Sequence, residues 1–171
     1  GAVLPLASGC SDDWFESDGQ ITKRPVRALT LSALAPRQGE HLWDIGGGSG
    51  SISIEWLLSH PSLSATAIES RADRADRSRG NASRLGVDRL QVVTGAAPQA
   101  LDGLQAPDVV FVGGGLNAAL LGWLEARLAP GTRLVANAVT LETEALLLEA
   151  QVRRGGDLLR IELATAAPLG R

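Results

Sequence analysis

Short apolar runs of strand length alternate along this chain with longer stretches in which apolar residues recur at helical spacing. The runs that predict β-strands cover residues 41–45, 64–69, 90–94, 108–113, 132–138 and 158–164. The stretches that predict helices cover residues 51–59, 72–85, 116–128 and 142–154. Because strand and helix alternate throughout, the pattern predicts a doubly wound α/β fold with a parallel sheet and right-handed crossovers.

Glycine or polar residues follow each of the first five predicted strands. These segments are residues 44–50, 69–71, 95–98, 113–115 and 137–142. In doubly wound sheets, ligands bind outside the carboxyl ends of the strands, where such segments meet. We therefore expect a ligand site at this edge of the sheet.

Composition narrows the classes of protein to which the chain can belong. It has 171 residues, of which 44% are hydrophobic, and this is enough for one domain with a sizeable core. The formal charge of -3 argues against a nucleic-acid binder that depends on broad phosphate neutralisation. Cys10 is the single cysteine, which excludes an internal disulfide and fits a reducing cytoplasm. The two histidines, His41 and His60, have no metal-ligand spacing, so we expect no metal site. The apolar window 109–124 contains four glycines and suits a strand, loop and helix better than a membrane span.

The loop WDIGGGSGS, which begins at Trp43, gives the most specific chemical signal in the sequence. Its glycines permit a tight turn and a close backbone approach to a ligand. A dinucleotide fingerprint would need glycine where Ser51 stands, and Asp44 would repel a pyrophosphate. S-adenosylmethionine has no phosphate and carries cationic groups that Asp44 could attract, while Glu69 could accept hydrogen bonds from ribose hydroxyls. The alternatives are a plain strand-to-helix turn for the loop and an exposed acid at a helix start for Glu69.

A D-x-G-x-G-x-G loop followed by an acidic end of the second strand resembles class I S-adenosylmethionine-dependent methyltransferases, which have a Rossmann-like doubly wound sheet. More narrowly, the chain resembles the decarboxylating carbon-15 precorrin methyltransferases of cobalamin (vitamin B12) biosynthesis. The stretches that carry this match are DGQITKRPVRALTLSAL from Asp18, WDIGGGSGSISIEW from Trp43, GAAPQAL from Gly95 and LVANAVTLE from Leu134. The resemblance implies methyl transfer to carbon 15 of a precorrin-6B-type tetrapyrrole, with loss of an acetate carboxyl group, giving a precorrin-8-type product.

The resemblance also implies a set of cofactor contacts. Thr22 would lie near the methionine end of the cofactor, Glu69 on the ribose and Ala97 beside the adenine. Ala96 stands where relatives often have an acid that faces the adenine amine, which leaves adenine recognition to backbone groups. The backbone around the amino-acid moiety would be that of Gly46, Gly47, Gly48, Ser49 and Gly50.

Candidate substrate and catalytic residues lie in three further segments. Cations at Lys23, Arg24 and Arg27 could clamp tetrapyrrole carboxylates, or could form a solvated first helix turn. Glycines at Gly113, Gly114 and Gly115 clear a space that a flat macrocycle needs. After the fifth strand, Asn137, Thr140 and Glu142 could bind the macrocycle or assist proton transfer, although Thr140 could instead cap the following helix. The arginines at 71, 74, 77, 79 and 84 are interpreted as a solvated helix surface.

We expect an amino-terminal extension over residues 1–17 and a methyltransferase domain over residues 18–171. The chain contains no methionine, and class I methyltransferases usually add a seventh strand after the point where this chain stops. We therefore expect the carboxyl-terminal half of a bifunctional enzyme, fused behind a carbon-5 methyltransferase domain, that forms a cytoplasmic homo-oligomer such as a tetramer. The alternatives are a class I methyltransferase for another small molecule or RNA, and a non-catalytic cofactor-binding domain. The acidic balance, the absence of Tyr and the presence of only two Phe weigh against RNA.

Overall fold

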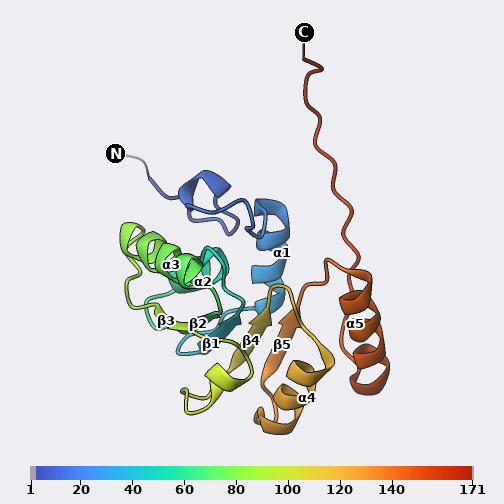
Figure 1. Cartoon of the computed structure of the whole chain (residues 1–171). Helices are drawn as coiled ribbons and strands as arrows, with labels where there is room; N and C mark the ends of the chain where they lie inside the picture. The colour runs from blue at the N-terminus through green and yellow to red at the C-terminus, as the bar shows by residue number, and fades with distance from the viewer. Residues whose placement is uncertain (1–2, 171) are drawn as a thin grey trace.

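The computed structural model describes residues 3–170 and is built around one parallel sheet (Figure 1). Its strands are β1 (His41–Ile45), β2 (Ser64–Glu69), β3 (Gln91–Thr94), β4 (Val109–Val112) and β5 (Arg133–Ala136). The order across the sheet is β3-β2-β1-β4-β5, and every neighbouring pair is parallel. The doubly wound parallel sheet predicted from the alternation of elements is thus confirmed.

Helices cover both faces of this sheet (Figure 1). On one face lie α1 (Arg24–Leu34), α2 (Ser51–Ser59) and α3 (Ala72–Arg84), which share a core with the strands. On the other face lie the short 3-10 helix η2 (Gln99–Leu101) together with α4 (Ala118–Arg127) and α5 (Leu141–Arg154). The pattern of apolar residues predicted these helices to within a few residues, except for η2 and α1, which were not among the predicted elements.

The alternating direction of side chains along β1 explains why the sheet has two cores. Leu42 joins the cluster with Trp56 of α2, whereas Trp43 and Ile45 join the cluster with Leu124 of α4. Because β1 is central and covered on both faces, all five of its residues are buried. Because β1 is packed on both faces, its position between the two layers of helices is fixed. The position of its carboxyl end, where the glycine-containing segment 46–50 begins, is therefore fixed as well.

The sixth predicted strand, over residues 158–164, is wrong. These residues are extended but form no ladder with any described strand, and they are exposed along their whole length. Figure 1 shows the chain leaving the end of α5 and running away from the sheet. The apolar pattern of a strand is present there, but a strand also needs a neighbouring backbone to pair with, and none lies beside this segment in residues 3–170.

The amino-terminal residues pack against the domain rather than standing apart from it. The backbone N–H groups of Gly9 and Cys10 donate to the buried Glu55 carboxylate of α2, at 2.8 and 3.2 Å. The 3-10 helix η1 (Asp12–Trp14) follows, and Phe15 joins the core. The predicted boundary between an extension over residues 1–17 and a domain over residues 18–171 stays a prediction. Residues 1–2 and 171, at the outer ends of these two ranges, lie outside the described residues.

Over the described part of the chain, none of the helices is long and apolar enough to cross a membrane.

Candidate functional site

The glycine loop lies at the carboxyl end of β1, between that strand and α2. Gly46, Gly48 and Gly50 have φ angles of 75°, 56° and 79°, a left-handed conformation that side chains disfavour. The N–H of Gly46 donates to the carbonyl of Ile68 at 2.8 Å, which ties the loop to β2. Glycine is therefore required by the backbone path of the loop, and its repeated use has a conformational cause.

Asp44 is buried at the mouth of this loop. Its side chain is 1% exposed, and the Ser53 hydroxyl donates to its carboxylate at 2.6 Å. Burial raises the pKa of Asp44 to about 6, with a smaller contribution from the negative charge of Glu69 and an opposing one from the Ser53 hydrogen bonds. A carboxylate held in this environment is stabilised in its charged form by a cationic ligand.

Glu69 ends β2 and braces the glycine loop directly. It is 4% exposed and accepts hydrogen bonds from the N–H groups of Gly48, at 2.9 Å, and Arg71, at 3.0 Å. The alternative of an exposed acid at a helix start is therefore wrong. Glu69 and Asp44 together give the loop two buried carboxylates as neighbours. This arrangement disfavours a phosphate and suits a ligand with cationic and hydroxyl groups.

Helix α3 holds the loop from the other side through residues that the sequence analysis missed. The Ser78 hydroxyl donates to the carbonyl of Gly48 at 2.6 Å, and the Asn81 amide donates to the carbonyl of Ser49 at 2.9 Å. Both side chains are fully or almost fully buried. Their signal in the sequence is two small polar residues, three positions apart, on the face marked by Ala75 and Ala82.

The end of β3 lies next to Glu69, as the adenine contacts implied by the resemblance require. The N–H of Gly95 donates to the carbonyl of Glu69 at 2.9 Å. Ala96 is exposed, whereas Ala97 is half-buried and packs against the core under η2 and α4. These two residues therefore stand at the same edge as the glycine loop.

The cations before and within α1 divide into two groups. Lys23 occupies the N-cap position of α1 without a side-chain capping hydrogen bond, and it is exposed, as is Arg24. Arg27 is 0% exposed, and its guanidinium donates to the carboxylates of Glu55, at 2.6 Å, and Asp12, at 3.0 Å. It also donates to the carbonyls of Thr22 and Cys10. The proposal that Arg27 clamps substrate carboxylates is wrong, because the core already uses its donors.

The glycine run after β4 lies beside the glycine loop after β1. The N–H of Gly113 donates to the carbonyl of Ile45 at 3.4 Å, and a methyl group built on Gly46 would lie 3.7 Å from the carbonyl of Gly114. A methyl group on Gly113 would meet the Phe111 ring at 3.2 Å. A side chain at Gly113 would therefore press on the Phe111 ring, whereas the space beside Gly114 and Gly115 is open.

The three candidate catalytic residues do not form one cluster. The Asn137 amide donates to the Thr30 hydroxyl of α1 at 3.1 Å, on one face of the sheet. Glu142 is exposed in the first turn of α5, on the other face, where it lines a depression of about 360 Å³ with Asn117. Thr140 caps α5, since its hydroxyl accepts from the N–H of Thr143 at 3.2 Å. The capping alternative considered for Thr140 is confirmed.

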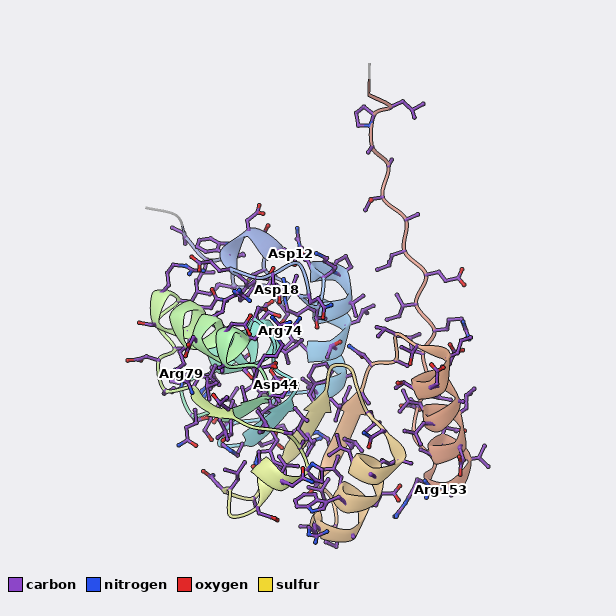
Figure 2. The ribbon with its side chains drawn as sticks, in the orientation of Figure 1. Asp12, Asp18, Asp44, Arg74, Arg79 and Arg153 are labelled. Carbon is purple, nitrogen blue, oxygen red and sulfur yellow. The ribbon has the colours of Figure 1, made fainter. Side chains whose placement is uncertain are left out.

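In residues 3–170, no three His, Cys, Asp or Glu side chains gather in a way that could hold a metal ion. Figure 2 shows Asp44 within the sheet, and the hydrogen bonds from Ser78 and Asn81 of α3 to the glycine loop join that loop and helix in one site. Such a site can bind and orient a cationic, phosphate-free nucleoside next to an open space.

Comparison with known proteins gives consistent matches along almost the whole chain. The profile of a family described as Precorrin methyltransferase domain matches residues 13–171. A Sinorhizobium protein named precorrin-6Y C(5,15)-methyltransferase [decarboxylating] is 57% identical over 170 residues, which cover 98% of this chain and 41% of that protein. A Salmonella typhi protein named cobalt-precorrin-6B C(15)-methyltransferase (decarboxylating) is 37% identical over 155 residues, covering 88% of this chain and 80% of that protein.

Among solved structures, the carboxyl-terminal domain of the precorrin-6Y C5,15-methyltransferase from Rhodobacter capsulatus superposes with a TM-score of 0.94. It is 54% identical, and the match covers 98% of this chain and 91% of that domain. The predicted class I methyltransferase fold is confirmed by this likeness. The chain spans less than half the length of the Sinorhizobium protein, so it corresponds to one part of a longer enzyme there.

Proposed function

Since this chain belongs to the precorrin methyltransferase domain family, we propose that it methylates carbon 15 of a precorrin-6B-type tetrapyrrole, with S-adenosylmethionine as methyl donor, and removes an acetate carboxyl group to give a precorrin-8-type product of cobalamin biosynthesis. The observation that carries the proposal is the pair of buried carboxylates, Asp44 and Glu69, on a glycine loop beside an open glycine run. The Salmonella relative supports the carbon-15 assignment, because it is named for that activity alone and the match covers most of its length.

The residues at the sheet edge suit S-adenosylmethionine in charge and shape. Asp44 would attract the cationic part of the cofactor, and Glu69, already fixed by two backbone donors, would accept from the ribose hydroxyls. The remaining cofactor contacts that we propose are Thr22, Gly46, Gly47, Gly48, Ser49, Gly50, Ala96 and Ala97. When bound, this cofactor supplies an electrophilic methyl group on a sulfonium.

The chain's own part in the reaction is chiefly to position the macrocycle. Gly113, Gly114 and Gly115 leave room for it, and the exposed cations Lys23 and Arg24 would hold its carboxylates. These groups orient the substrate and keep the reacting carbon in line with the methyl donor. The reacting carbon of the proposed tetrapyrrole is an electron-rich, enamine-like ring carbon, so its methylation needs little help from a protein base.

Asn137 and Glu142 remain candidates for contact with the macrocycle, each from its own face of the sheet. Turnover that is unchanged in Glu142→Gln would remove that carboxylate from the mechanism. The matched control is Glu149→Gln, an exposed acid two turns later on α5 that lines the same depression. A drop in turnover for Glu142→Gln alone would support proton transfer or substrate contact by Glu142.

Calorimetric titration with S-adenosylhomocysteine tests the cofactor class. We expect binding to the wild-type chain, at least tenfold weaker binding to Glu69→Ala, and no change in Asp88→Ala, an exposed acid away from the loop. NAD serves as the control ligand. Binding of NAD instead of S-adenosylhomocysteine would refute the methyltransferase proposal.

Incubation with precorrin-6B and methyl-labelled S-adenosylmethionine tests the reaction itself. We expect one labelled methyl group in the product and release of carbon dioxide. Labelling of another small molecule or of RNA, with no reaction of precorrin-6B, would favour the alternative methyltransferases. Cofactor binding with no transfer to any acceptor would favour a non-catalytic binding domain.

We also propose that the full protein is cytoplasmic, self-associates and carries an amino-terminal domain that methylates carbon 5. The greater length of the Sinorhizobium relative supports the fusion. Exposed apolar side chains on α5 support self-association, since Leu141, Leu148 and Val152 are 80%, 51% and 83% exposed. Light scattering of the purified chain would give the number of copies.

A further inference from the structure

Residues 16–22 form a strap that passes over the glycine loop. The carbonyl oxygen of Gln20 lies 3.6 Å from the place where a methyl group on Gly48 would stand. The strap therefore lies against the loop on the side where the proposed cofactor's amino-acid end would be held. The contacts that hold the strap in place are therefore relevant to how the proposed cofactor enters and leaves.

The carboxyl end of the strap is fixed by the buried Arg27. Its guanidinium donates to the carbonyl of Thr22 while it also pairs with Glu55 and Asp12. The Phe15 ring stacks on the same guanidinium, 4.8 Å from ring centroid to carbon. Because Arg27, Glu55 and Phe15 are buried, this end of the strap opens only if the core is disrupted.

The amino end of the strap is fixed by Asn81 of α3. The N–H of Glu16 donates to the Asn81 side chain at 3.0 Å, and the Asn81 amide donates to the carbonyl of Glu16 at 2.9 Å. The same amide donates to the carbonyl of Ser49 in the glycine loop. Asn81 is 1% exposed, so this end is also held by a buried contact.

The middle of the strap is held by a more accessible contact. The Asp18 carboxylate pairs with Arg74 at 2.8 Å and with Arg77 at 3.8 Å, and Arg74 also donates to the Gln20 side chain at 3.2 Å. Figure 2 shows Asp18 and Arg74 facing each other between the amino-terminal segment and α3. The side chains of Asp18, Arg74 and Arg77 are 25%, 18% and 25% exposed, so water can reach the pair. We call the Asp18–Arg74 contact the latch. The pairing of Arg74 and Arg77 with Asp18 corrects their interpretation as part of a solvated helix surface.

We propose that Asp18 and Arg74 are positioning residues that hold the middle of the strap over the cofactor's amino-acid end, and that breaking this pair lets the cofactor exchange. The proposal rests on the proposed function, because it takes the cofactor to be bound at the glycine loop. The two ends of the strap keep it attached to the domain, while the Asp18–Arg74 pair decides how often its middle lifts. Loss of the pair shortens cofactor residence without changing the chemistry of the site.

The test is the dissociation rate of S-adenosylhomocysteine from Asp18→Asn and Arg74→Gln, measured by stopped-flow competition. Asparagine keeps the hydrogen bond that Asp18 accepts from the N–H of Gln20, at 3.1 Å, so the local turn survives. The matched control is Arg79→Gln, which removes the same charge from the same helix but breaks only contacts to Asp76 and the carbonyl of Val92. We expect dissociation to be about two- to fivefold faster in the two latch variants and unchanged in the control.

Two further measurements separate a latch from general weakening. The melting temperature of the ligand-free variants should match that of Arg79→Gln. The acceleration in the double variant should be smaller than the product of the two single effects, because both changes break the shared Asp18–Arg74 contact. Equal dissociation rates in Arg74→Gln and Arg79→Gln would overturn the latch while leaving the proposed function intact. Failure of the wild-type chain to bind S-adenosylhomocysteine would overturn both.

Discussion

Protonation of Asp44 should weaken cofactor binding below pH 6. Because its pKa lies at about 6 in the folded chain, roughly ten in eleven chains carry the charged form at pH 7 and roughly one in eleven at pH 5. If only the charged form attracts the cationic end of the ligand, the apparent dissociation constant rises about tenfold between these pH values.

The same shift has a consequence for stability without ligand. The folded pKa of Asp44 is raised from 3.8 to about 6, so the folded chain binds the proton more tightly than the unfolded chain. The contribution of Asp44 to stability is therefore fully present below pH 3.8 and is lost as the pH rises through 6, by about 3 kcal/mol in total. A bound cation stabilises the charged carboxylate and offsets this loss.

The assay is calorimetric titration of S-adenosylhomocysteine from pH 5 to pH 8 into the wild-type chain and Asp44→Asn. Asparagine can still accept the Ser53 hydrogen bond but does not titrate, so titration of the ligand is common to both proteins. We expect the wild-type affinity to fall about tenfold from pH 7 to pH 5 and that of the variant to be weaker and nearly flat. A wild-type affinity that is constant over this range, or a variant with an equally steep profile, would refute the reasoning.

Three other predictions concern the loop, the α5 cap and a buried histidine. Gly50→Ala should destabilise the chain by about 1–2 kcal/mol in urea unfolding, because Gly50 has a φ of 79° and the new methyl group would lie 3.1 Å from the Ser78 hydroxyl. The control Gly80→Ala, in the open interior of α3, should stabilise the chain by about 0.5–1 kcal/mol. Equal effects of the two substitutions would contradict this reasoning. Thr140→Ala should cost about 1 kcal/mol in the same unfolding assay and leave turnover unchanged, whereas lost turnover at full stability would restore a catalytic role. Burial lowers the pKa of His41, against a smaller opposing effect of the Asp108 charge. The contribution of neutral His41 to stability is therefore present above pH 6.5 and is lost as the pH falls below that value. The free energy of unfolding should fall less between pH 7 and pH 5 in His41→Asn than in the wild type, and identical falls would count against this prediction.

Local sequence was enough to predict the sheet and the central part of the site. Residues 41–45, 51–59 and 64–69 were predicted with the bounds that the structure has. Short apolar runs that alternate with helical stretches are typical of covered parallel strands, and such strands bring their carboxyl ends to one edge. The glycine loop, Asp44 and Glu69 follow from that rule, because each is adjacent in sequence to the end of a strand.

Long-range contacts decided the rest. Arg27 reads as a surface cation at the start of a helix, yet it lies in the core because Glu55, 28 residues away, is buried beside it. Asn81 and Ser78 read as ordinary polar helix residues until Glu16, 65 residues from Asn81, and the carbonyls of the glycine loop are brought against them. Residues 158–164 have the alternation of a strand but no backbone beside them to pair with. By itself the sequence determined which backbone could turn, bury and end at the ligand edge, since these properties depend on neighbours along the chain. Only the tertiary structure decided which charged groups are buried, since a buried charge depends on partners that the fold brings to it, such as Glu55 for Arg27 and the N–H of Gly48 for Glu69.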